Sequence, residues 1–166
     1  METIIFKVSQ KFTQIWLWLI VFIIVALSLW GIIQQIFFNI PFGNHPVSDK
    51  ALWFYGLIPL TIVLLFFNLR LQTLVKKDGI YVRFFPFIIK YKRIKIGEIK
   101  SFKIRKYNPR KEYGGWGIRF AGSKVGKAYN VKGNIGMQFE FTNEKKLLIG
   151  TQKPDEFLKA VEKIKS

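Results

Sequence analysis

The stretch "IWLWLIVFIIVALSLWGII", residues Ile15 to Ile33, contains 19 residues, none of which is charged. A helix of about 20 apolar residues, rising about 1.5 Å per residue, crosses the hydrocarbon core of a bilayer. Trp16 and Trp18 lie near one end and Trp30 near the other, as expected for aromatic rings at the two membrane interfaces. We therefore predict a transmembrane helix over about residues 13–38.

A second apolar stretch, "ALWFYGLIPLTIVLLFFNL", runs from Ala51 to Leu69, again without a charge. It contains Gly56 and Pro59, which membrane helices tolerate when a neighbouring helix satisfies the freed backbone groups. A cleaved signal peptide has a shorter apolar run, about 7 to 15 residues, followed by a small-residue cleavage site. The first stretch has neither feature. We therefore expect a retained helical hairpin, with its second helix over about residues 51–69.

The distribution of Lys and Arg predicts the orientation of this hairpin. The N-terminal tail carries Lys7 and Lys11, the connecting loop carries only Lys50 beside Asp49, and the second stretch runs directly into Arg70. Loops rich in Lys and Arg stay on the cytoplasmic side of a membrane. We therefore predict a protein of the cell (inner) membrane with both termini in the cytoplasm.

Most of the charge follows the hairpin. Residues 70–166 hold 24 of the 27 Lys and Arg residues and eight of the ten Asp and Glu residues, a formal balance of +16. We expect two parts: residues 1–69, the tail with its hairpin, and residues 70–166, a basic cytoplasmic domain. Such a balance favours an anionic partner, and the membrane tether favours the inner leaflet over nucleic acid. The chain also lacks the sequence signatures of nucleic-acid-binding modules.

The residue types that support catalysis are sparse. The chain has no cysteine, which excludes thiolate chemistry and disulfides, and its one histidine, His45, lies in the loop of the hairpin. Glu98, Glu112 and Glu140 are the acids without an obvious structural role, and their spacing fixes no mutual geometry. We therefore predict a non-enzymatic protein with no cofactor and no metal site.

The sequence of the basic segment predicts strands followed by one helix. "GIYVRFF", Gly79 to Phe85, alternates apolar positions after an Asp-Gly turn, and "FIIKYKRIKIGEI", residues 87–99, continues the pattern. About seven strands of ordinary length fit. At the end, "KPDEFLKAVEKIKS" places Phe157, Val161 and Ile164 on one face of a helix that begins near Pro154. We expect this amphipathic helix to cover a small sheet.

Three motifs carry a resemblance to a known family: "EYGGWGIR" (Glu112–Arg119), "AYNVKGNIGMQFEF" (Ala128–Phe141) and "LLIGTQKPDEF" (Leu147–Phe157). The chain resembles an uncharacterised family of small bacterial membrane proteins that have a two-helix anchor followed by a pleckstrin-homology-like (PH-like) domain. The resemblance implies an α+β membrane protein: an N-terminal transmembrane helical hairpin, then an antiparallel PH-like β-barrel of about seven strands capped by a C-terminal α-helix. It implies no activity and no binding residues.

The glycines of "GGWG", Gly114 to Gly117, match neither the Walker loop nor the dinucleotide fingerprint. One interpretation is a bulge or tight bend, with Trp116 in the core. The other is a close approach of a ligand to the glycine backbone, with Trp116 on the surface.

The basic run has two interpretations as well. Between Lys90 and Lys111 there are ten Lys or Arg residues and one acid. Lysines on the solvent face of strands are ordinary, and they discourage aggregation. Near an anionic leaflet, however, each is worth about 1 kcal/mol within about 8 Å of the surface. The candidate contacts for anionic lipid or ligand are Lys76, Lys77, Lys90, Lys92, Arg93, Arg105, Lys106, Arg110, Lys111, Arg119 and Trp116.

We therefore expect a membrane-anchored, non-enzymatic module that docks on the anionic inner leaflet or binds an anionic ligand there. The alternative is an accessory subunit of a membrane complex that recruits a cytoplasmic partner through the PH-like domain. In that case Gly31 and Gly56 would allow close contact with another membrane protein or a second copy of the chain.

Overall fold

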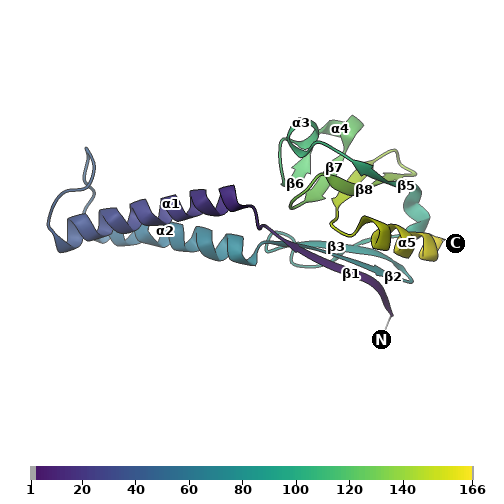
Figure 1. Cartoon of the computed structure of the whole chain (residues 1–166), viewed down its shortest axis with the longest axis horizontal. Coiled ribbons are helices and arrows are strands. Elements are labelled where there is room, and N and C mark those ends of the chain that lie inside the picture. The colour runs from purple at the N-terminus through teal and green to yellow at the C-terminus, as the bar shows by residue number, and fades with distance from the viewer. Residues whose placement is uncertain (1–2, 166) are drawn as a thin grey trace. The chain divides into compact units, whose positions relative to one another are not determined.

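The computed structural model describes residues 3–165, which form two compact units (Figure 1). The helical unit is Thr13–Asn68. The sheet unit combines the N-terminal residues up to Phe12 with the chain from Leu69 onwards. The helical unit is therefore an insertion within the sequence of the sheet unit.

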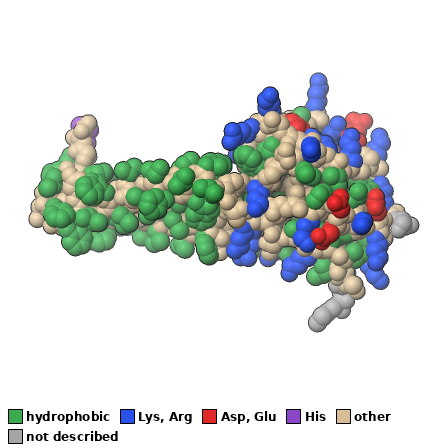
Figure 2. All heavy atoms as spheres, viewed as in Figure 1, with side chains coloured by type: hydrophobic (Ala, Val, Ile, Leu, Met, Phe, Trp, Pro, Cys, Tyr) green, Lys and Arg blue, Asp and Glu red, His purple; other side chains and the backbone are tan. Residues whose placement is uncertain are grey.

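The helical unit is a hairpin of two long apolar helices. Helix α1 (Ile15–Ile32) continues into a π-helical turn (Ile33–Phe37), and helix α2 (Asp49–Asn68) contains Pro59. The spans expected from the sequence are thus helices. Each is long and apolar enough to cross a membrane, and only 11% of either span is buried. Figure 2 shows apolar side chains covering this unit, unlike a core helix of a globular domain.

Glycine allows the two helices to approach closely. A Cβ atom added to Gly56 of α2 would lie 2.7 Å from Cδ1 of Ile32 in α1. The loop folds back onto the same hairpin, because the amide of Gln35 donates to the carbonyl of Val47 at 2.6 Å and to Asp49 at 2.9 Å. Gly56 therefore allows close packing of α1 and α2 within the hairpin.

The first sheet of the sheet unit has four antiparallel strands in the order β1-β2-β3-β4. The strands are β1 (Ile4–Lys11), β2 (Arg70–Lys76), β3 (Gly79–Phe85) and β4 (Lys92–Ile94). The Asp-Gly turn between β2 and β3 is where the sequence predicted it.

Strand β1 corrects the expected division of the chain, which placed the N-terminal tail with the hairpin. Its sequence alternates, with Phe6, Val8 and Gln10 buried and their neighbours Lys7 and Ser9 exposed. It pairs with β2 along its length. The period-two signal was present in the sequence, but the far stronger apolar run that follows it obscured the strand.

The second sheet has five strands in the order β5-β8-β9-β7-β6. The strands are β5 (Ile99–Lys106), β6 (Gly117–Phe120), β7 (Lys127–Asn130), β8 (Ile135–Phe141) and β9 (Lys146–Gly150). A 3-10 turn (Ile96–Glu98) precedes β5, and the short helices α3 (Pro109–Tyr113) and α4 (Gly122–Val125) flank β6. Strands β7 and β9 are parallel, and the other pairs are antiparallel.

The α+β class is confirmed, but the described residues form two sheets with nine strands and no closed barrel, where a barrel of about seven strands was expected. The parallel pair was also unexpected. It begins at Gly126, whose φ of +90° suits glycine, and a Cβ atom there would lie 2.2 Å from the carbonyl oxygen of Lys146. Only a residue without a side chain lets β7 start so close to β9.

Helix α5 (Pro154–Lys165) is the amphipathic helix that the sequence predicted, and it joins the two sheets. The fully buried ring of Phe157 stacks on Phe6 of β1, with 5.1 Å between ring centroids. It also meets Phe139 of β8 edge-on at 6.2 Å. The core of the sheet unit therefore depends on one helical side chain held between a residue of each sheet.

Candidate functional site

The chain leaves the sheet unit and returns to it at one end of the first sheet. Lys11, the last residue of β1, is paired with Arg70, the first residue of β2, and Arg70 is paired with Phe85, the last residue of β3. Helix α1 begins four residues after Lys11, and α2 ends two residues before Arg70. We call the part of the sheet unit around Lys11, Arg70 and Phe85 the connection end.

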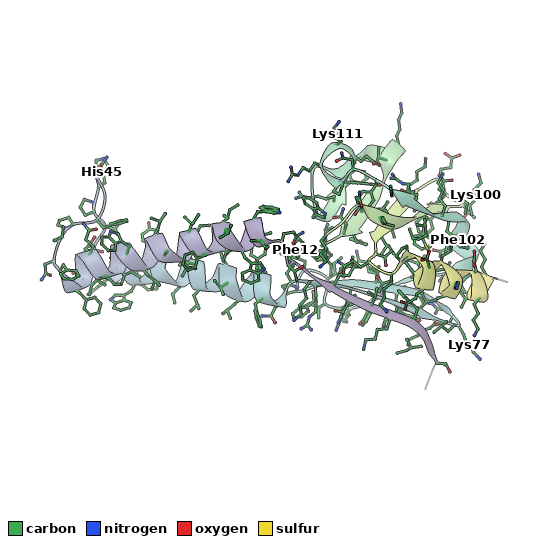
Figure 3. All side chains as sticks on the ribbon, viewed as in Figure 1. Phe12, His45, Lys77, Lys100, Phe102 and Lys111 are labelled. Atoms are coloured by element: carbon green, nitrogen blue, oxygen red, sulfur yellow. The ribbon has the colours of Figure 1, made fainter. Side chains whose placement is uncertain are left out.

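The predicted contact residues do not form a single site. Lys76 and Lys77 lie at the opposite end of β2 from Arg70, about 20 Å away at about 3.3 Å per residue. In Figure 3, Lys77 and Lys100 lie at the end of the sheet unit opposite Phe12, whereas Lys111 lies towards the end that holds Phe12. Only part of the predicted set can therefore meet one flat surface at the connection end.

The side chain of Arg93 binds the turn between β2 and β3. Its guanidinium forms an ion pair with the Asp78 carboxylate at 3.0 Å and donates to the Asp78 carbonyl at 2.7 Å. Tyr81 also donates to this carboxylate. The Tyr81 hydrogen bond first, and the charge of Arg93 second, lower the pKa of Asp78 below its usual value. Lys76 lies over the Tyr81 ring, 5.0 Å from its centroid.

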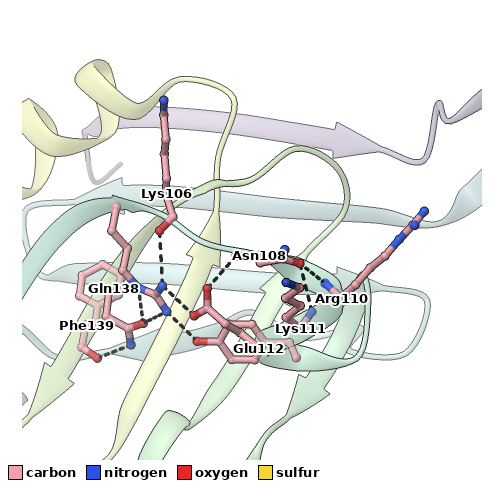
Figure 4. Close-up of polar contacts among 9 residues, drawn as sticks. Lys106, Asn108, Arg110, Lys111, Glu112, Gln138 and Phe139 are labelled. Carbon is pink, nitrogen blue, oxygen red and sulfur yellow. Dashed lines mark hydrogen bonds and ion pairs between the residues drawn. The ribbon is translucent and has the colours of Figure 1, made fainter.

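Arg105 is also a structural residue. Its guanidinium binds the Glu112 carboxylate at 2.8 Å, the Gln138 side-chain oxygen at 3.1 and 3.2 Å and the Tyr113 hydroxyl at 3.3 Å (Figure 4). The second oxygen of Glu112 accepts from the backbone N–H of Asn108 at 2.7 Å. Glu112, one of the acids without an assigned role, therefore anchors α3 to β5 and β8.

The glycine-rich segment is a bend, as the first interpretation predicted. Gly114, Gly115 and Gly117 have φ values of 69°, 126° and 117°, which allow the chain to bend between α3 and β6. The expected core position of Trp116 is wrong, since its side chain is half-buried and its indole N–H donates to the Gly133 carbonyl at 3.1 Å. The buried aromatic residue of this segment is Tyr113, which packs edge-on against Tyr107 with Ala128 and Leu148 nearby.

The structure does bring three of the predicted residues together around this bend. The Arg110 guanidinium lies 5.6 Å from the centroid of the Trp116 ring. Arg119 donates to the Trp116 carbonyl at 2.9 Å. Arg110 and Arg119 are exposed. They form a small cationic and aromatic surface, a combination suited to a phosphate-bearing partner.

The exposed lysines of the predicted set divide by position. Lys90 follows Phe85 in the loop after β3, Lys106 ends β5, and Lys111 lies in α3. Lys92 lies in β4 opposite Val82, near the middle of the first sheet. We call Lys90, Lys106 and Lys111 the near lysines.

Sequence reasoning missed the loop between β3 and β4. Residues 87–99 were expected to continue a strand, but β4 contains only Lys92–Ile94, and residues 86–91 form an irregular turn. Phe87 and Ile89 in this loop are 64% and 66% exposed. Pro86 was the signal, because proline cannot donate to a ladder and seldom lies within a strand.

A wide groove on the second sheet was also missed. Its charged lining has both signs, and Lys146 lies 3.6 Å from Glu140. Among the described residues, no group of three or more His, Asp or Glu side chains is placed to hold a metal ion. The charged residues that line the groove are Glu98, Lys100, Lys124, Lys127, Glu140, Glu144, Lys145 and Lys146.

Tyr107 gives the sheet unit a testable pH dependence. Burial raises the pKa of Tyr107 to about 12. A raised pKa means that the fold favours the neutral phenol, so this stabilisation is complete below the ordinary pKa of 10.0 and is lost as pH rises towards 12. We expect a loss of about 2–3 kcal/mol over this interval. Urea unfolding against pH measures it, and Tyr107→Phe should show a flatter profile; an unchanged profile would contradict the assignment.

These features define a class: an α+β protein whose basic two-sheet unit carries an apolar helical hairpin inserted between two neighbouring strands. Over residues 1–165 the chain matches the model of a family described as a family of unknown function, DUF6141, and it belongs to that family. The expected membership of an uncharacterised family is therefore confirmed. A search of curated proteins gives no match.

Proposed function

We propose that this protein is a non-enzymatic module anchored in the inner membrane by α1 and α2, with both termini cytoplasmic, and that its sheet unit docks on the anionic leaflet. The observation that carries the proposal is the pairing of Lys11 with Arg70. Because the strands on either side of the hairpin are neighbours, the chain must enter and leave the membrane on the same side. Two crossings satisfy this condition.

The exposure of the helices supports membrane anchoring. A core helix of a globular domain is mostly buried, whereas these two expose apolar side chains along their length. Cleavage of the first helix as a signal peptide would also remove β1, whose Phe6 and Val8 are buried in the sheet unit. A retained hairpin keeps both the sheet and the anchor.

The division of charge supports docking on an anionic surface. The sheet unit contains 26 Lys and Arg residues and nine Asp and Glu residues, whereas the helical unit contains only Lys50 and Asp49. The whole formal charge of +17 therefore belongs to the sheet unit. This division also supports the cytoplasmic orientation, because the residues that translocate are neutral overall.

The arrangement of the sheet unit supports a PH-like module. The mostly antiparallel strands and the C-terminal helix α5, whose Phe157 packs against Phe6 and Phe139, agree with the layout that the family resemblance implies, whereas the two open sheets differ from its closed barrel. In this module, strand β1 precedes the anchor in the sequence, and the other strands follow it.

The connection end is the part of this module that the tether holds near the bilayer. Electrostatic attraction falls off within about 8 Å of a charged surface at physiological salt. Lys90 follows Phe85 in the loop after β3, Lys106 ends β5 shortly before α3, and Lys111 of α3 lies towards the end that holds Phe12 (Figure 3), whereas Lys77 lies at the other end of the first sheet. We therefore propose that the near lysines contribute most of the attraction, each about 1 kcal/mol.

Two triple variants with equal changes of charge test this proposal. K90E/K106E/K111E changes the near lysines, and K77E/K100E/K145E changes exposed lysines at the opposite end. In anionic vesicles, the backbone amides at the connection end of the full-length protein should be protected from hydrogen exchange. High salt should abolish this protection, and so should the near triple variant, K90E/K106E/K111E. The far triple should retain most of it, because its lysines lie beyond the screening length. Equal protection in neutral and anionic vesicles would rule out electrostatic docking.

A second candidate function is an accessory subunit that recruits a cytoplasmic protein. Strand β6 lies at the edge of the second sheet, and its Ile118 and Phe120 are 42% and 66% exposed. Edge strands with exposed apolar side chains are sites for pairing with another chain. A partner that co-purifies with the wild type and the near triple, but not with I118K/F120K, would favour this function.

A further inference from the structure

The loop between β3 and β4 presents an apolar tip. Phe87 and Ile89 are large and about two-thirds exposed, whereas the turn between β2 and β3 is formed by Lys77 and Asp78. The turn between β8 and β9 is also polar, with the sequence Thr-Asn-Glu-Lys at residues 142–145. Exposed apolar residues that cluster at a loop tip mark an interaction surface.

The base of this loop is fixed by a polar network. The backbone N–H of Ile88 donates to the Phe84 carbonyl at 2.7 Å. The Arg83 guanidinium lies 4.5 Å from the centroid of the Tyr91 ring, and both side chains donate to the Gln72 side-chain oxygen. The network joins the strand before the loop to the residue after it. The apolar tip is therefore held outwards before any partner binds, which reduces the entropy lost on binding.

The register places this loop at the connection end. Phe85, the residue before the loop, is paired with Arg70, and Arg70 is paired with Lys11. The loop therefore projects from the end of the sheet at which the chain departs for α1 and returns from α2. Its exposed Lys90 adds a positive charge, and residues 79–97 contain no acid.

We infer that this loop inserts Phe87 and Ile89 into the interface of the bilayer, with Lys90 at the level of the lipid phosphates. The inference rests on the proposed membrane anchoring and adds a third, non-spanning contact to it. A short apolar segment beside a cation suits this depth, since interfacial segments are buried about 5–10 Å at the boundary of headgroups and acyl chains. The loop then fixes the tilt of the sheet unit on the membrane, which the flexible side chains of the near lysines alone could not do.

Single cysteines test the insertion, because the natural chain has none. Full-length Phe87→Cys and Ile89→Cys variants, each carrying a fluorophore, are reconstituted in phosphatidylcholine vesicles with and without phosphatidylglycerol. Some of the lipids carry a nitroxide quencher on the acyl chain. Lys77→Cys serves as the solvent control, and Leu19→Cys, 56% exposed on α1, reports on the anchor itself. Labels at 87 and 89 should be quenched severalfold more than the label at 77 in both kinds of vesicle, since apolar insertion does not require anionic lipid.

The two failures are distinguishable. If the label at 19 is not quenched by lipid, the proposed anchoring is wrong. If the label at 19 is quenched but those at 87 and 89 match the label at 77, the anchoring stands and the loop insertion is wrong. A label at 87 that is shielded from aqueous quenchers but not quenched by lipid shows burial against protein and also overturns the inference.

A second experiment places the label beside the apolar residues and leaves Phe87 and Ile89 themselves unlabelled. A fluorophore at Lys90→Cys should be quenched by the acyl-chain nitroxide in the otherwise wild-type chain. The added changes F87S/I89S should reduce this quenching to the level of the label at 77. Both residues are exposed, so the thermal unfolding midpoint should not change. Unchanged quenching in the presence of F87S/I89S would contradict the insertion.

Discussion

The fragment Arg70–Ser166 is expected not to fold, whereas a chain in which residues 13–68 are replaced by an Asn-Gly turn is expected to fold as a soluble protein. The fragment corresponds to the cytoplasmic domain expected from the sequence, but it lacks β1. Far-ultraviolet circular dichroism with thermal melting compares the two. A fragment that melts with the same cooperativity and midpoint as the joined chain would show that β1 is dispensable.

The expected loss follows from what β1 buries. Phe6 and Val8 are buried, and each buried apolar side chain contributes about 1.5–3 kcal/mol. The side-chain amide of Gln10 donates to the Gly150 carbonyl at 2.7 Å, which links the two sheets. Removing β1 also exposes the whole edge of β2. Together these losses are comparable with the total stability of a small domain, about 5–15 kcal/mol.

The geometry of the junction explains why the joined chain should succeed. Lys11 and Arg70 are already antiparallel partners, and the next residues, Phe12 and Leu69, are both buried. A two-residue Asn-Gly connection between Phe12 and Leu69 is the preferred length for a β-hairpin. The replacement therefore converts two strands separated by the helical unit into an ordinary hairpin and leaves the register unchanged.

The second large effect is expected from Phe157→Ala, which should destabilise the sheet unit by about 3–5 kcal/mol. The ring is fully buried between Phe6 and Phe139, so its removal leaves a cavity between α5 and both sheets. Urea unfolding of the joined chain measures the free energy. Phe120→Ala, at a position 66% exposed, removes the same number of atoms and should change it little. A loss below about 1 kcal/mol for Phe157→Ala would contradict the packing of α5.

The features that the sequence predicted correctly have local signals. An uncharged run marks α1, and a stripe of apolar residues four and three positions apart marks α5. The turn at Asp78 and Gly79 is likewise fixed by two adjacent residues. In each case a few neighbouring side chains determine the backbone conformation.

The remaining features depend on contacts between distant residues. Strand β1 is stable only because β2, about 60 residues later, supplies its partner and α5 supplies Phe157. The parallel pairing of β7 with β9 depends on the close contact of Gly126 with Lys146. No local pattern distinguishes two open sheets from one closed barrel.

The candidate site shows the same division. The number of Lys and Arg residues identifies the basic segment. It does not distinguish arginines that form structural ion pairs from lysines that face solvent. Arg93 forms an ion pair with Asp78, which is distant from it in sequence. Arg105 forms an ion pair with Glu112, which lies on another element. The neighbouring Lys106 has the same charge as Arg105, but its side chain is exposed.

The sidedness of the hairpin can be measured by labelling from one side of the membrane. Single cysteines at Lys7 in β1, Asn44 in the hairpin loop and Lys145 in the β8–β9 turn can be labelled in intact cells with a maleimide that does not cross membranes. For a hairpin with both termini in the cytoplasm, we expect labelling of Asn44→Cys from outside, and labelling of Lys7→Cys and Lys145→Cys only after the membrane is opened. Labelling of positions 7 and 145 from opposite sides, or of position 44 from the same side as position 145, would contradict a hairpin that crosses the membrane twice.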